Sequence, residues 1–89
     1  MPIKTYLILT ESTKAMDVNT LTLADDYFRD GYTMLRGIGC YQGQREKATG
    51  ILVTGVSLFQ VQAFVKLVKG FNKQKCVLVL AWDTEVLYI

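Results

Sequence analysis

A strand and a helix meet in residues 48–61, ATGILVTGVSLFQV. The segment from Ala48 to Val56 is rich in β-branched residues, which favour a strand. Ser57 and Gln60 follow it with the three-residue spacing of a capping box, in which each side chain bonds the other residue's backbone N–H. The sequence therefore predicts a strand that leads directly into a well-capped helix.

The rest of the C-terminal half continues this pattern. Beyond Gln60, apolar residues recur every three or four positions, the helical period, at Val61, Phe64, Val68 and Phe71. Lys75 to Ala81 is short and apolar and predicts another strand. After a predicted turn at Trp82 to Glu85, the segment Val86 to Ile89 is expected to form a short extra strand.

The N-terminal half shows the same alternation of elements. Ile3 to Leu9 is β-branched and aromatic and predicts a strand, and Thr33 to Tyr41 predicts a second one. Between them a helical period starts near Asp17, which we assign as the N-cap, and Gly31 is placed to end the helix. The predicted order is strand, helix, strand, strand, helix, strand, within a single domain over residues 1–89.

This order predicts an α+β fold: a ferredoxin-like βαββαβ antiparallel sheet with both helices on one face and the short extra C-terminal strand beside it. Apolar residues occupy both the odd and the even positions of the strands, which point to opposite faces of the sheet. Both faces must therefore be covered by other parts of the protein or by a partner. The helices can cover one face. Other subunits are the remaining cover for the second, and the sequence therefore predicts a homo-oligomer.

Composition supports that prediction. A chain of 89 residues builds only a small core, yet 51% of its residues are hydrophobic and its mean hydropathy is +0.22. Cys40 and Cys76 lie inside apolar runs, so we expect both to be buried and reduced, as in a cytoplasmic protein. With no His and two isolated Cys residues, the sequence predicts no metal site.

Other partner classes have little support. The net charge is only +2, and the basic residues form neither a block nor a known nucleic-acid motif. No apolar run approaches the length of a membrane span, and the N-terminal run is too short for a signal peptide. The prediction is a cytoplasmic protein that binds neither nucleic acid nor membrane.

The predicted turn between the two middle strands is the main candidate for chemistry. If Tyr41 ends one strand and Glu46 begins the next, they flank a four-residue turn as cross-strand neighbours. A phenol and a carboxylate so placed can orient a polar substrate or exchange a proton. The alternative is ordinary surface polarity on a turn. Cys40 is read as packing rather than as a nucleophile, because no partner base is visible.

Five segments in order and at similar spacing carry a family resemblance: residues 6–9 (YLIL), 17–19 (DVN), 39–41 (GCY), 46–47 (EK) and 75–79 (KCVLV). Together they resemble the small phage enzymes that degrade S-adenosylmethionine (SAM), known as SAM hydrolases or SAM lyases. The resemblance implies a PII-like homotrimer of ferredoxin-like protomers, with ligand sites between subunits. It also implies that Tyr41 and Glu46 are the catalytic residues.

On this resemblance the expected reaction is intramolecular. The carboxylate of SAM attacks its own γ-carbon and expels methylthioadenosine, leaving L-homoserine lactone, without cofactor or metal. Tyr41 and Glu46 then hold and orient the substrate. Thr10, Glu11 and Ser12 follow the first strand and are predicted to bind substrate, reaching a neighbouring subunit's hairpin; the alternative is an ordinary polar loop.

Three other readings stay open. A hydrolase would use Glu46 to activate a water. A non-enzymatic PII-like module would bind an adenosine ligand at subunit clefts, and a small phage interaction or inhibitor protein would need no ligand site. Trp82 suits either stacking on an adenine or sulfonium or sealing the core.

Overall fold

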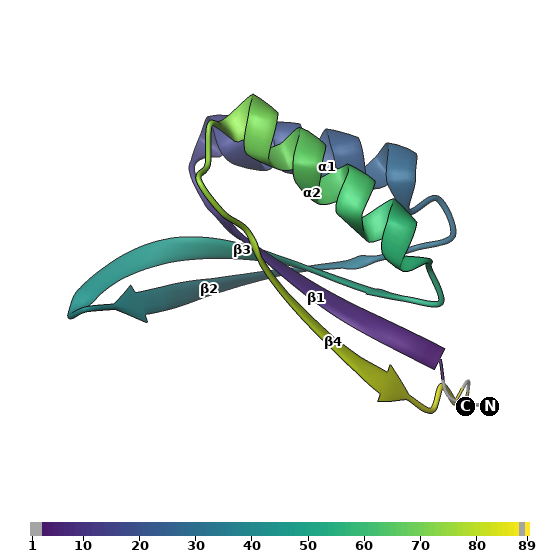
Figure 1. Ribbon diagram of the computed structural model, residues 1–89. Coiled ribbons are helices and arrows are strands. Elements are labelled where there is room, and N and C mark those ends of the chain that lie inside the picture. The colour runs from purple at the N-terminus through teal and green to yellow at the C-terminus, as the bar shows by residue number, and fades with distance from the viewer. Residues whose placement is uncertain (1–2, 88) are drawn as a thin grey trace.

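The computed structural model describes residues 3–87 and 89, with the backbone alone at Tyr41. Its elements are β1 (Ile3–Glu11), α1 (Lys14–Tyr27), β2 (Thr33–Tyr41), β3 (Gln44–Thr54), α2 (Leu58–Asn72) and β4 (Leu78–Thr84). The strands form one antiparallel sheet in the order β2-β3-β1-β4. Both helices lie over the same face of that sheet (Figure 1). The predicted α+β, ferredoxin-like βαββαβ architecture is confirmed.

The core lies between the sheet and the helices. Its buried members are Tyr6, Ile8, Ala24, Phe28, Ile51, Val53, Val61, Phe64 and Val68. Phe28 and Phe64 bring the two helical segments together with ring centroids 4.9 Å apart. Because Ile8 pairs with both Ile51 and Val79, these positions point to the same, helix-covered face.

Helix α2 begins as predicted. The Ser57 hydroxyl accepts a hydrogen bond from the Gln60 backbone N–H (3.1 Å), and the Gln60 side-chain oxygen accepts one from the Ser57 backbone N–H (3.0 Å). The capping box therefore satisfies two N–H groups that the helix start would leave unpaired. At the other end, Lys73 adopts the left-handed conformation typical of a helix terminus.

Helix α1 begins one turn earlier than predicted. Thr13 is its N-cap and accepts a hydrogen bond from the Met16 N–H (3.1 Å). The assignment of Asp17 as N-cap is wrong, because the Asp17 carboxylate is directed at the sheet instead. The helix also ends before Gly31: its last residue is Tyr27, and Phe28 is the C-cap.

Strand β4 is displaced towards the C-terminus relative to its predicted range. Its pairing with β1 runs from Leu78 opposite Leu9 to Thr84 opposite Ile3, so Trp82 lies in the strand and not in a turn. Residues 85–87 and 89 form no strand, and residue 88 lies outside the described part. The short extra strand predicted at Val86 to Ile89 is therefore not formed over the residues that the structure describes.

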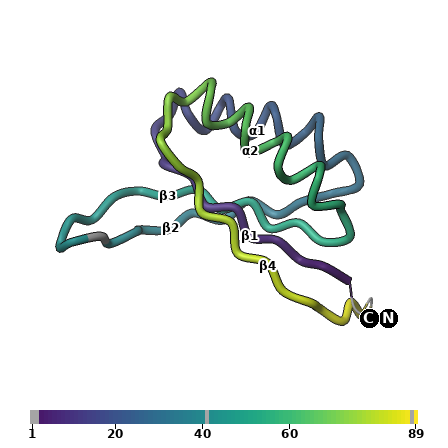
Figure 2. The backbone as a smooth tube through the Cα atoms, viewed as in Figure 1, coloured from purple at the N-terminus to yellow at the C-terminus, as the bar shows by residue number. Residues whose placement is uncertain are grey.

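The second face of the sheet carries no helix, as Figure 2 also shows. Strand alternation turns Leu7 and its cross-strand partners Leu52 and Leu80 to this face, opposite to Tyr6 and Ile8. Other members are Leu9, Leu35, Leu78 and Trp82. We call this set the open face.

Two further properties concern the surface. Cys40 and Cys76 are free and exposed, so the prediction that both are buried is wrong for this chain. Within the described residues, no helix is both long and apolar enough to cross a membrane.

Candidate functional site

The β2–β3 hairpin forms an arm that extends past the helix layer (Figures 1 and 2). Its turn contains only Gln42 and Gly43, both at positive φ (51° and 79°). A two-residue turn with positive φ at both positions matches the right-handed twist of the two strands that it joins. Tyr41 therefore pairs with Gln44, and the predicted four-residue turn is wrong.

Glu46 is consequently not the direct cross-strand neighbour of Tyr41. Its partner is Gly39, two residues before Tyr41 in β2. Tyr41 and Glu46 occupy diagonal positions of the same ladder, and such positions lie about 7–8 Å apart. The side chain of Tyr41 lies outside the described part of the chain, so its contacts are not assigned.

Glu46 and Glu11 line one depression at the base of the arm. Its volume is about 250 Å³, and its other lining residues are Leu9, Thr10, Gly39, Cys40, Gln44, Lys47, Ala48 and Leu78. Glu11 pairs with Ala48 at its backbone, and Ala48 pairs with Gly37. The two exposed carboxylates thus stand beside small residues of the open face, and we call this depression the acidic groove.

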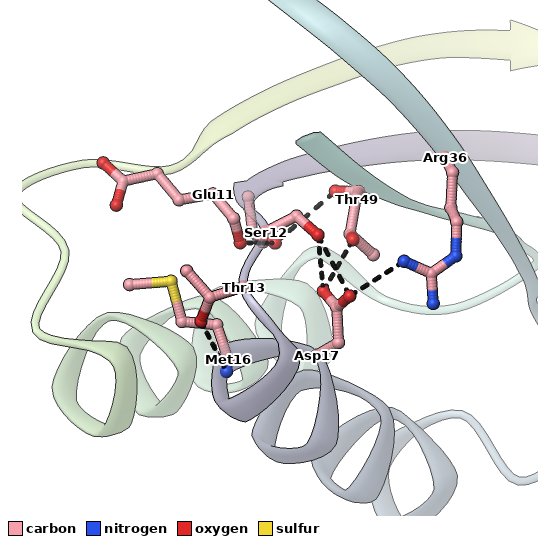
Figure 3. Close-up of polar contacts among 8 residues, drawn as sticks. Glu11, Ser12, Thr13, Met16, Asp17, Arg36 and Thr49 are labelled. Carbon is pink, nitrogen blue, oxygen red and sulfur yellow. Dashed lines mark hydrogen bonds and ion pairs between the residues drawn. The ribbon is translucent and has the colours of Figure 1, made fainter. Parts of the chain in front are cut away.

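The predicted substrate-binding trio Thr10, Glu11 and Ser12 divides between the two faces. Thr10 is 3% exposed, and its hydroxyl donates to the Glu11 carbonyl oxygen (3.1 Å). Glu11 is exposed, and its carboxylate points away from Asp17 in Figure 3. Ser12 lies beside Asp17 instead. Of the three, only Glu11 presents a free functional group next to Glu46.

A polar cluster around a buried carboxylate lies at the same end of the molecule, between α1 and the sheet (Figure 3). Asp17 is its centre, with 8% of its surface exposed. The Thr49 hydroxyl donates to Oδ1 (2.7 Å), the Ser12 hydroxyl lies 3.0 Å from both carboxylate oxygens, and Arg36 Nη1 pairs with Oδ2 (2.9 Å). The cluster ties α1 and the residue after β1, Ser12, to β2 and β3 where the arm begins.

The charge state of Asp17 follows from these contacts. Burial by itself raises the pKa of the carboxyl, but the hydrogen bonds from Thr49, Ser12 and Arg36 and the charge of Arg36 outweigh it. The net pKa is lower than the usual value, so Asp17 is ionised at neutral pH. Sequence reasoning missed this cluster because Arg36 and Thr49 are remote from Asp17 in the chain.

Trp82 lies outside the acidic groove and is not part of the cluster around Asp17. Trp82 lies on the open face and is 43% exposed, so it does not seal the core under the helices. Among the described residues, no three His, Cys, Asp or Glu side chains gather as a metal site. The acidic groove is thus the place where predicted site residues meet.

Comparisons with known proteins identify the fold. No family model matches the chain, and no curated protein matches its sequence. Among solved structures, a PII-like nitrogen regulatory protein, CPII from Thiomonas intermedia K12, bound to ADP, AMP and bicarbonate, has a TM-score of 0.68 at 20% identity. That match covers 100% of this chain and 97% of CPII.

Two other solved structures are similar. A phage SAM lyase in its apo state has a TM-score of 0.60 at 20% identity, covering 92% of this chain and 81% of the lyase. CutA from Synechococcus elongatus PCC7942, complexed with Bis-Tris, has a TM-score of 0.64 at 9% identity, with 93% and 80% covered. The protein has a PII-like fold, which it shares with both an enzyme and ligand-binding proteins.

Proposed function

We propose that this protein is a SAM lyase that releases methylthioadenosine and L-homoserine lactone. The observation that carries the proposal is the acidic groove, where Glu46 and Glu11 line one depression beside the apolar residues Leu9 and Leu78. SAM carries a cationic sulfonium and an ammonium group, and a pair of carboxylates attracts such cations, most strongly where water is excluded. The similarity in fold to a phage SAM lyase supports the same assignment.

The reaction is balanced without outside reagents. A carboxylate oxygen of SAM forms a bond to its own γ-carbon while the bond from that carbon to sulfur breaks. The electron pair of the broken bond stays on sulfur, which leaves as the neutral thioether methylthioadenosine. The ammonium group is unchanged, so the lactone retains the single positive charge and no proton moves.

The protein's task in such a reaction is orientation. Folding the methionyl chain into attack geometry and removing water from the carboxylate can supply about 7–11 kcal/mol in favourable cases. In our proposal Glu46 and Glu11 hold the positively charged groups of the substrate, and Tyr41 positions it from the adjacent strand. Glu46 then acts as a binding group and not as a base.

The active form in this proposal is a homotrimer of single domains spanning residues 1–89, in the cytoplasm. The open face supports an oligomer, because Leu80 and Trp82 remain 44% and 43% exposed there in the single chain. Packing the open faces together places the acidic groove at a subunit boundary. A neighbouring subunit can then close the groove and exclude water from it.

Product analysis in ¹⁸O-labelled water tests the reaction. A lyase produces methylthioadenosine and an initial lactone without label, and later lactone opening places ¹⁸O in the carboxyl group. A hydrolase in which Glu46 activates water instead places ¹⁸O in the γ-hydroxyl of homoserine. Absence of methylthioadenosine under all conditions would remove the enzymatic proposal.

Substitutions test the residues. We expect Glu46→Gln and Tyr41→Phe each to lower kcat/KM by at least about tenfold, because each removes one orienting contact. Glu11→Gln is expected mainly to raise KM, since Glu11 binds the substrate's charge. Glu85→Gln, an exposed carboxylate in the C-terminal segment, is the matched control. Full activity in both Glu46→Gln and Tyr41→Phe would disprove the site.

A second candidate function follows from the similarity to CPII, whose solved structure holds ADP, AMP and bicarbonate. In that case the protein binds an adenosine ligand without turnover. A ligand that binds the folded state raises the melting temperature, and the stabilisation grows with the logarithm of the ligand concentration relative to its Kd. Stabilisation by ADP or AMP with no conversion of SAM would favour this module over the lyase.

A further inference from the structure

Two adjoining depressions lie at the base of the arm, on the side of the sheet that carries the helices. Their volumes are about 660 Å³ and about 360 Å³, and Ser12, Arg36 and Lys47 line both of them. The larger one extends along α1 to Lys14, Val18 and Leu21, and the smaller one extends along the arm to Ile38. We call the two together the basic hollow.

The register of the arm brings two cations to this face. Arg36 lies opposite Thr49, which is buried beneath α1, and Lys47 lies opposite Ile38, two positions along the ladder. Residues of one parity point to one face of a sheet. Arg36 and Lys47 are therefore diagonal neighbours on the helix side, at positions about 7–8 Å apart. Glu46 has the other parity, so its carboxylate belongs to the opposite face.

Lys14 adds a third cation from the start of α1. Among residues 3–87 and 89, no ion pair involves Lys14 or Lys47. Arg36 pairs with Asp17 through Nη1, but its side chain is 63% exposed, and the described residues place no acceptor on Nη2 or Nε. Asp17 is the single acidic side chain among the described residues that line the hollow. The hollow therefore keeps two positive charges in excess.

This excess charge favours a dianion over a monoanion. A phosphate monoester carries about −1.5 to −2 at neutral pH and presents three strong acceptor oxygens, whereas a carboxylate carries a single charge. A guanidinium binds phosphate through paired N–H donors, and lysine ammonium groups bind it as point charges. Apolar surface flanks the cations, because Val18 is 61% exposed and Ile38 is 74% exposed. An apolar group attached to the phosphate can cover that surface.

We propose that the basic hollow binds a small phosphate monoester with an apolar organic group. The free N–H donors of Arg36 and the ammonium groups of Lys14 and Lys47 hold the phosphate, and the organic group covers the exposed apolar side chains beside them. Lys47 also borders the acidic groove. The proposed SAM chemistry is nevertheless a separate function, because its carboxylates face the other side of the sheet.

The probe is phenyl phosphate, and benzoate is the matched anion with the same ring and a single charge. Two-dimensional ¹H–¹⁵N NMR titrations at constant ionic strength measure the binding of each. We expect saturable shifts of the backbone amides of Lys14 and Lys47 and of the Arg36 Nε–H with phenyl phosphate. Benzoate should bind at least about tenfold more weakly, since it lacks the second charge. Inorganic phosphate should displace phenyl phosphate.

Two double substitutions locate the site. Lys14→Gln with Lys47→Gln should weaken phenyl phosphate binding at least about tenfold, because both charges contact the phosphate. Lys66→Gln with Lys69→Gln removes the same charge from α2, outside both depressions, and should change binding by less than about twofold. Arg36 is kept because it also pairs with Asp17. The NMR spectrum of each variant shows whether it is folded.

Several outcomes would overturn the proposal. Absence of saturable shifts with phenyl phosphate would do so, as would equal affinity for benzoate. Failure of inorganic phosphate to compete would show that the ring alone is bound. Equal weakening by the two double substitutions would show that net charge, and not the basic hollow, attracts the anion.

Discussion

Asp17 shows how one residue can organise the base of the arm. A carboxylate with 8% exposure is costly to bury unless donors surround it, and here Thr49, Ser12 and Arg36 all donate to it. These donors come from three different strands or loops. The carboxylate therefore links the start of α1 to the strands that carry the proposed site.

Replacing Asp17 by Asn tests this role. We expect Asp17→Asn to lower the free energy of unfolding at neutral pH by about 1–3 kcal/mol. The neutral amide removes the charged acceptor that Thr49, Ser12 and Arg36 now share. The pKa of Asp17 in the folded state is lower than its usual 3.8. Its contribution is therefore present above that value and is lost as the pH falls through the lower, folded-state pKa.

Urea unfolding at several pH values measures both effects. The difference between wild type and Asp17→Asn should be largest near neutral pH and should shrink below pH 3.8. Asp26→Asn, an exposed position on the same helix, should change stability by less than about 0.5 kcal/mol. A difference that is constant with pH would show that the charge of Asp17 does not carry the effect.

At the scale of elements, the start of α2 and the tip of the arm depend on short-range rules. Ser57 and Gln60 form a capping box that needs no distant partner. Gln42 and Gly43 close the arm through positive φ angles. In both cases neighbouring residues determine the geometry, so a substitution there changes the free energy of unfolding through local contacts alone.

The helix cap gives one prediction. We expect Ser57→Ala to lower the free energy of unfolding by about 1 kcal/mol, because the N–H of Gln60 loses its acceptor. Ser57→Asp preserves an acceptor at this position and should retain most of the stability. Denaturant unfolding measures both variants. Equal losses in the two would contradict a capping role.

The arm gives a second prediction at this scale. Gly43 has a φ of +79°, so Gly43→Ala should destabilise the protein by about 1 kcal/mol through backbone strain. Gly70 lies in α2, and an added Cβ there meets no atom within 4 Å. Gly70→Ala should therefore stabilise the protein by about 0.4–1 kcal/mol. Thermal unfolding of both variants checks the opposite signs.

At the scale of the whole molecule, the sheet has one covered and one open face. Leu80 and Leu78 of β4 and Leu35 of β2 are exposed on the open face. The side chains of Leu7 and Leu9 lie over Gly50 on this face, in the space that a Cβ would need. An apolar sheet surface of this kind is stable in water when another subunit covers it.

A charge on the open face tests this arrangement. We expect Leu80→Glu to shift the protein from an oligomer to a monomer, since the buried carboxylate would have no partner in the interface. Phe59→Glu places the same charge on the helix side and should leave the oligomer intact. Sedimentation measures the mass of each variant. An oligomer unchanged by Leu80→Glu would contradict assembly through the open face.

Local patterns in the sequence determined much of this architecture. The Ser57–Gln60 spacing located the start of α2, and the apolar parities of the strands predicted a sheet with two apolar faces. These features depend on residues within a few positions of one another. A capping box or a strand's alternation therefore remains readable without knowledge of its surroundings.

The tertiary structure alone decided the register and the composition of the sites. Pairing of Glu11 with Ala48 and of Gly39 with Glu46 brings the two carboxylates to one groove, while Thr10 turns to the buried side. A shift of one residue would reverse every side chain of a strand. That register arises from packing between segments distant in the chain, and the same long-range contacts made Asp17 a buried centre rather than a helix cap.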